Sequence, residues 1–165
     1  MLPFEEALIT PQSSDLPGRF YSAADYHALY RSGKVTPLQV AEALLPLIQR
    51  GPNESKYAAA WTHCHPEEVL AAAEASTERW ARGQPLSVLD GVPFGVKDDV
   101  DVEGFVSSMG MRVDEGKAEY FRKVRETTSW PVRKLIEAGA VLVGKMNQHE
   151  VGMGKSYMFP GEVEV

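Results

Sequence analysis

The sequence has one cysteine, no long apolar run and fewer basic than acidic residues, and each shortage excludes a class of protein. Cys64 has no partner in the chain, which excludes an internal disulfide and favours a reducing compartment, the cytoplasm. No apolar run approaches the roughly 18 residues of a membrane span, and the acidic start MLPFEEALIT is atypical of a signal peptide. With 17 Lys and Arg against 23 Asp and Glu, the net charge of −6 disfavours nucleic-acid binding through a basic face.

What remains is a globular chain of 165 residues, 44% hydrophobic and 24% charged, the size of one domain or part of one. Caps and apolar spacing predict helices that begin after Ser22, at Pro37, at Pro66 and after Thr128 or Ser129. The predicted strands are 57–62, 92–97 and 140–143. The order strand, helix, strand predicts a parallel α/β sheet, and so few strands indicate the beginning of a larger domain.

Two patterns imitate ligand sites without meeting their requirements. Residues 139–145 match a phosphate-binding loop up to its lysine, but Met146 replaces the Ser or Thr that holds magnesium, and the intervening residues are typical of a strand. His63-Cys64-His65 could supply two zinc ligands, whereas a zinc site needs three or four, and the sequence has no second cluster. We therefore predict neither a metal site nor a cofactor.

Lys97 ends the predicted strand 92–97, and two interpretations of it are open. A lysine at the end of a buried strand loses solvation, which favours an uncharged amine able to take a proton from a hydroxyl nucleophile. Alternatively, Lys97 is a surface lysine that pairs with a nearby carboxylate, from Asp98, Asp99 or Asp101. Composition alone favours the second interpretation.

Several segments resemble the amidase signature family of hydrolases, in order and with natural spacing over residues 20–153. Asp90–Asp98 resembles the family segment "G-[VI]-P-x-x-V-K-D". Residues 22–48 resemble the family's first helices, and residues 60–73 resemble its next strand and helix. Lys134–Asn147 resembles "KLREAGAVILGKTN", and Glu150 matches the acidic residue that follows it. On these segments together the chain is identified as a member of that family.

The resemblance implies an α/β fold with a mixed β-sheet core covered by helices, incomplete in this chain. The proline- and serine-containing composition of residues 1–20 predicts an irregular amino-terminal arm. The resemblance predicts the amino-terminal part of an amidase domain over 21–153 and a divergent tail over 154–165. It also implies that Lys97 is the general base of a Ser-cisSer-Lys triad. Asp99 departs from the family, which often has Asn there, and this would change the hydrogen bonding around Lys97.

The triad's two serines are expected in later Gly/Ser-rich segments that this sequence does not contain. Ser107-Ser108 lacks that glycine setting, and we do not assign a nucleophile there. The implied activity is hydrolysis of a small-molecule carboxylic amide to an acid and ammonia or amine, without a cofactor, and the chain alone is predicted to be inactive. The alternative is a catalytically inactive interaction module that pairs with another chain through its unfinished sheet. The sequence predicts neither the particular amide nor the oligomeric state.

Overall fold

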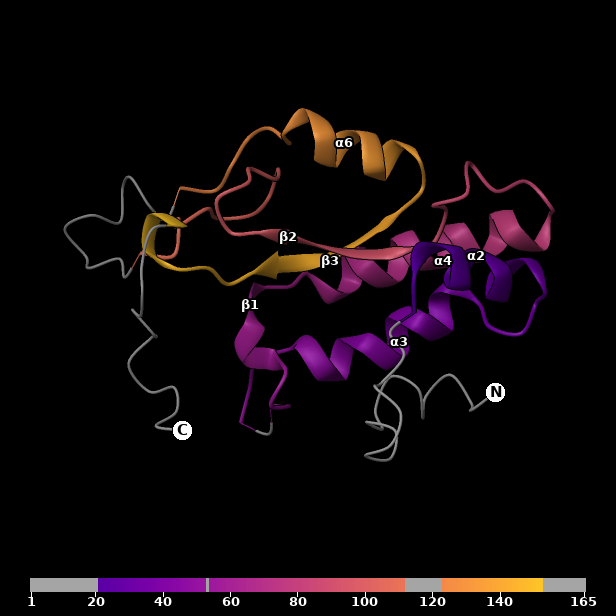
Figure 1. Cartoon of the computed structure of the whole chain (residues 1–165), viewed down its shortest axis with the longest axis horizontal. Coiled ribbons are helices and arrows are strands. Elements are labelled where there is room, and N and C mark those ends of the chain that lie inside the picture. Colours follow the sequence, from indigo (N-terminus) through magenta and orange to yellow (C-terminus); the bar gives the residue numbers. More distant parts are fainter. Residues whose placement is uncertain (1–20, 53, 112–122, 153–165) are drawn as a thin grey trace. The chain divides into compact units, whose positions relative to one another are not determined.

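The computed structural model describes residues 21–52, 54–111 and 123–152 (Figure 1). These residues divide into two compact units. The described residues of the first unit are 21–46, 66–94 and 135–143, and those of the second are 47–52, 54–65, 95–111, 123–134 and 144–152. The predicted arm 1–20 and tail 154–165 lie outside the described residues, so these boundaries stay predictions. Within the described ranges, no helix combines the length and apolar character needed to cross a membrane.

The first unit is built on helices that the sequence predicted. They are α2 (Ala23–Arg31), most of α3 (Pro37–Ile48) and α4 (Pro66–Ala81). Helices α2 and α4 lie side by side (Figure 1), and the rings of His27 and Trp80 meet with their centroids 5.3 Å apart. Residues of the helices and of the chain before β2 form one buried cluster, which consists of Tyr26, Tyr30, Val40 and Val92. Burial raises the pKa of the Tyr26 hydroxyl to about 12.

Helix α2 begins with the cap that the sequence predicted. The Ser22 hydroxyl accepts the N–H of Asp25 (3.2 Å), and the Asp25 carboxylate accepts the N–H of Ser22 (2.9 Å). This reciprocal pair satisfies N–H groups that have no partner inside the helix.

We expect Ser22→Ala to lower the free energy of unfolding by about 1 kcal/mol, because the N–H of Asp25 loses its acceptor. Urea unfolding followed by circular dichroism measures the change. Ser22→Asn is the control, since an Asn side chain caps equally well and should keep the stability of the parent. Equal losses in both variants would contradict the capping role.

Three strands form a mixed sheet in the order β1-β3-β2, which confirms the α/β fold class expected from the resemblance. The strands are β1 (Trp61–His63), β2 (Pro93–Lys97) and β3 (Val141–Met146). Strands β2 and β3 run in the same direction, with Val141 donating to the carbonyl of Val92 and Asp98 donating to that of Met146, each at 2.9 Å.

The expectation of an all-parallel sheet is wrong for β1, which pairs antiparallel with β3. The predicted strand 57–62 is also shorter than expected. Ala58–Ala60 form a 3-10 helix (η1), and extended backbone begins only at Trp61. Alanine has high helix and low strand propensity, which explains why the three alanines do not extend β1.

The chain after β2 returns to the sheet through α6 (Trp130–Glu137), which begins after Ser129 as predicted. The N–H and hydroxyl of Ser129 both donate to the carbonyl of Asp101, at 2.9 Å each. Glu150–Gly152 follow β3 as a short 3-10 helix, η3.

Candidate functional site

Lys97 is the last residue of β2, and its side chain leaves the strand on the face opposite buried Val96. The Lys97 side chain is 52% exposed, and its Nζ lies 3.2 Å from the Asp99 carboxylate. The burial that would favour an uncharged amine is therefore not found at Lys97 in this structure. Its surroundings match the other interpretation, a surface lysine paired with a carboxylate.

The buried lysine of this region is Lys145, on β3, with an exposed fraction of 0%. Its Nζ donates to the carbonyls of Asp98 (2.9 Å) and Val100 (2.6 Å) and to the hydroxyl of Ser107 (2.8 Å). Burial lowers the pKa of Lys145, and the nearby Asp98 carboxylate opposes this effect. Lys145 thus joins β3 to the segment that follows Lys97.

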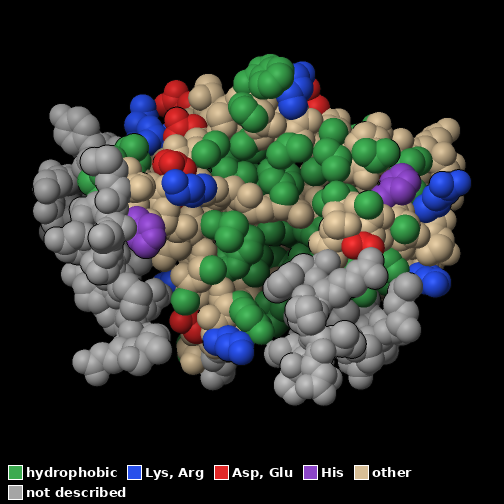
Figure 2. All heavy atoms as spheres, in the orientation of Figure 1, with side chains coloured by type: hydrophobic (Ala, Val, Ile, Leu, Met, Phe, Trp, Pro, Cys, Tyr) green, Lys and Arg blue, Asp and Glu red, His purple; other side chains and the backbone are tan. Residues whose placement is uncertain are grey.

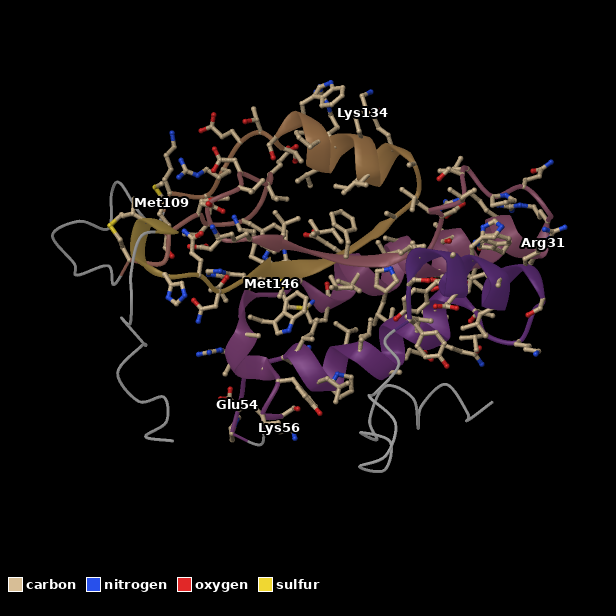
Figure 3. The ribbon with its side chains drawn as sticks, in the orientation of Figure 1. Arg31, Glu54, Lys56, Met109, Lys134 and Met146 are labelled. Atoms are coloured by element: carbon tan, nitrogen blue, oxygen red, sulfur yellow. The ribbon has the colours of Figure 1, made fainter. Side chains whose placement is uncertain are left out.

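Asp98, the residue directly after Lys97, is also buried. Its carboxylate accepts the Ser108 hydroxyl (2.6 Å) and the N–H groups of Ser108 (3.1 Å) and Gly110 (2.9 Å). Its own N–H donates to the carbonyl of Met146, which Figure 3 labels on β3. We name the side chains of Lys145, Asp98, Ser107 and Ser108 the Lys145 network.

The distance of 2.8 Å between Lys145 Nζ and Ser107 Oγ would suit a general base and its nucleophile. This pair nevertheless cannot act on an external substrate. Both side chains are buried, so a substrate carbonyl has no approach to the Ser107 hydroxyl. The Lys145 network therefore holds backbone in place. The Lys97 side chain, by contrast, is exposed at the end of β2 and is accessible to a substrate or to further polypeptide.

Ser107 and Ser108, where the sequence assigned no nucleophile, both place their hydroxyls in the Lys145 network. Sequence reasoning missed the role of Lys145, which it considered as part of the look-alike phosphate loop and of the segment that resembles "KLREAGAVILGKTN". A signal was available: Val141, Val143 and Lys145 alternate along one strand, so Lys145 shares the face of two buried valines.

His63, Cys64 and His65 form no metal site with other residues, since no group of three or more suitable ligands occurs in the part of the chain that the structure describes. The ring of His65 stacks on Phe105 with centroids 4.1 Å apart. Burial lowers the pKa of His63, with the Asp98 carboxylate opposing it, and burial raises the pKa of the Cys64 thiol.

Comparison with known proteins gives a consistent result. The family model described as Amidase matches residues 42–161. The chain is 36% identical to a fatty acid amide hydrolase of Arabidopsis thaliana, over 82% of this chain and 22% of that protein. It is 38% identical to one component of the glutamyl-tRNA(Gln) amidotransferase of Chloroflexus aggregans, over 79% of this chain and 25% of that protein.

Solved structures agree in fold. A crystal structure of an amidase superimposes with a TM-score of 0.65 at 29% identity, covering 81% of this chain and 28% of that one. The native peptide amidase of Stenotrophomonas maltophilia superimposes with a TM-score of 0.66 at 23% identity, covering 86% and 26%. The chain spans about a quarter of the length of the curated relatives that it matches.

Proposed function

This chain belongs to the amidase family, and from that premise we propose that it supplies Lys97 as the general base of an enzyme that hydrolyses carboxylic amides to an acid and ammonia or amine. The observation that carries the proposal is the position of Lys97. It ends β2 within the Asp90–Asp98 segment that resembles the family signature, and its amine is accessible. The single Cys64 supports a reducing compartment, the cytoplasm, for this enzyme.

The proposed chemistry needs two serine hydroxyls brought to Lys97. The uncharged amine takes a proton from a bridging serine, which takes one from the nucleophilic serine. The nucleophilic oxygen attacks the amide carbon, the C–N bond breaks as the nitrogen gains a proton, and water then hydrolyses the acyl-enzyme to release the acid. Polypeptide that covers Lys97 would remove water from the amine and favour its uncharged form.

We also propose that the 165-residue chain alone does not hydrolyse amides. The sequence contains no Gly/Ser-rich segment of the kind expected to carry the two serines. Without a nucleophilic serine no acyl-enzyme forms, whatever the state of Lys97.

The test is a chimera in which this chain replaces the matching part of the Arabidopsis thaliana relative, assayed with a primary fatty acid amide. We expect the chimera to release ammonia and Lys97→Ala to lower kcat by about 10³-fold, within the range for loss of a general base. Lys123→Ala is the matched control, because Lys123 is exposed and pairs only weakly with Glu126 at 3.5 Å.

The unfused chain completes the experiment and should release no ammonia. Full activity of the Lys97→Ala chimera would contradict the role of Lys97. Hydrolysis by the unfused chain would contradict its proposed inactivity, and loss of that hydrolysis in Lys97→Ala would still support the base.

A second candidate function is an interaction module. The order β1-β3-β2 leaves one side of β2 without a partner strand among residues 21–52, 54–111 and 123–152. Hydrophobic side chains also reach the surface over α6 (Figure 2), where Trp130 and Ile136 are exposed. A chimera that folds with the relative's remaining polypeptide yet hydrolyses nothing would favour this second candidate.

A further inference from the structure

We propose that Lys145 is a positioning residue for Lys97. Through the Lys145 network, Lys145 fixes the backbone that follows Lys97. This sets the position from which the Lys97 side chain projects from β2. The functional part of this inference rests on the proposed role of Lys97, but the positioning itself is a property of the folded chain and can be measured without a substrate.

The first support is the match between donors and acceptors. A lysine ammonium has three N–H donors, and Lys145 Nζ has three acceptors within 2.9 Å, namely the carbonyls of Asp98 and Val100 and the Ser107 hydroxyl. Two of the three acceptors are backbone atoms one and three residues after Lys97. A buried cation with every donor satisfied is a rigid support, because any shift would leave polar groups unpaired in the interior.

The second support is the complete restraint of Asp98, the residue directly after Lys97. Its N–H is held by the carbonyl of Met146, its carbonyl by Lys145, and its carboxylate by Ser108 and Gly110. Two of these four partners are adjacent residues of β3. We call these four hydrogen-bonding partners the Asp98 cage. Strand β2 holds the residue before Lys97, and the Asp98 cage holds the residue after it. The main freedom that remains to Lys97 is therefore rotation about the bonds of its side chain.

The third support is the charge distribution. Lys145 and Asp98 are both buried, and the Asp98 carboxylate favours the charged form of the Lys145 amine. Lys97 keeps a separate carboxylate, Asp99, at its exposed amine. The two lysines therefore differ in role. Buried Lys145 holds the backbone after Lys97, and the amine of Lys97 stays accessible for chemistry.

The experiment compares the full chain with Lys145→Met, which keeps an unbranched side chain one heavy atom shorter and removes the three N–H donors. We expect amide hydrogen exchange at Asp98, Ser108 and Gly110 to accelerate by about tenfold or more, because the Asp98 cage opens. The side-chain CεH₂ signal of Lys97 in a ¹H–¹³C NMR spectrum, assigned with Lys97→Arg, should shift at the same time. That shift reports on the environment of Lys97 itself, which a general loss of stability does not alter in the folded state.

Lys123→Met is the matched control and should change neither the exchange of these amides nor the Lys97 signal, since Lys123 is exposed. An unchanged Lys97 signal in folded Lys145→Met would overturn the proposal. If Lys145→Met does not fold, Ser107→Ala decides, because it removes one acceptor and leaves the ammonium. It should shift the Lys97 signal and accelerate exchange of the three amides about threefold, and the absence of both changes would overturn the proposal.

The two proposals fail in different ways. Loss of the Lys97 shift contradicts the positioning role of Lys145 and says nothing of catalysis. A Lys97→Ala chimera with full activity contradicts the catalytic role of Lys97 and leaves the measured positioning intact.

Discussion

Asp90→Asn should lower the free energy of unfolding by about 3 kcal/mol, because it breaks a buried ion pair and leaves the Arg79 guanidinium without its counter-charge. The Asp90 carboxylate is fully buried and accepts two N–H groups of Arg79 (2.7 and 2.8 Å), the Ser76 hydroxyl (2.7 Å) and the N–H of Leu86 (2.8 Å). We expect the lower end of the range for broken buried pairs, since the Arg79 side chain remains 22% exposed.

Glu78, which precedes Arg79 in α4, offers a matched control, Glu78→Gln. Glu78 pairs with Arg82 at 3.6 Å, but both side chains are largely exposed, so this change should cost less than about 0.5 kcal/mol. Urea unfolding followed by circular dichroism measures both variants. Similar losses at Asp90 and Glu78 would show that burial adds nothing to the pair.

The pH dependence of the Asp90 variant follows from the same contacts. Burial would raise the pKa of Asp90, but the hydrogen bonds from Arg79, Ser76 and Leu86 outweigh it and lower that pKa in the folded chain. The charged carboxylate therefore stabilises the fold above the unfolded pKa of about 3.9, and this contribution is lost as pH falls through the lower folded value. The stability difference between parent and Asp90→Asn should thus be constant near neutral pH and shrink in acid.

Gly139→Ala should lower the free energy of unfolding by about 3 kcal/mol, because the added methyl group meets both backbone strain and the buried Asp90 side chain. Gly139 follows α6 with φ of +92°, and a Cβ there would lie 2.6 Å from Asp90 Oδ1 and 3.1 Å from its Cα. The left-handed conformation costs a residue with a side chain about 1 kcal/mol, and overpacking adds about 2 kcal/mol. Urea unfolding measures the sum.

Gly83→Ala separates the two contributions. Gly83 follows α4 with φ of +67°, and a Cβ there would have nothing within 4 Å. The backbone bonds match as well: Gly83 donates to Trp80 and Gly139 to Ile136, three residues earlier in each case. Gly83→Ala should therefore cost only about 1 kcal/mol. Equal costs at the two glycines would contradict the close approach of Gly139 to Asp90.

The four α-helices in the described part of the chain were predictable because their signals are local. Ser22 caps α2 through a contact with Asp25, three residues away, and Pro66 begins α4 as its position in the sequence indicated. The exception was also local in origin, since Ala58–Ala60 resemble a strand only if their helix propensity is ignored. The direction of β1 was not predictable from these signals, because pairing with β3 joins residues more than eighty positions apart.

The two lysines show the limit for the site. The signature around Lys97 identifies the residue proposed as the base, yet the burial first expected for Lys97 belongs to Lys145. Strand alternation puts each lysine on a face but does not say what covers that face. In this chain the cover over Lys145 comes from residues 98–107, which is a property of the fold of that segment.

The sequence by itself determined where the helices begin, which residues alternate along β2 and β3, and the family to which the segments belong, since each depends on neighbours a few residues apart or on a string of letters. Only the tertiary structure decided which lysine is desolvated and which carboxylates are paired inside. The physical reason is that the electrostatic state of a side chain depends on every atom within several ångströms, and folding brings most of those atoms from distant parts of the chain.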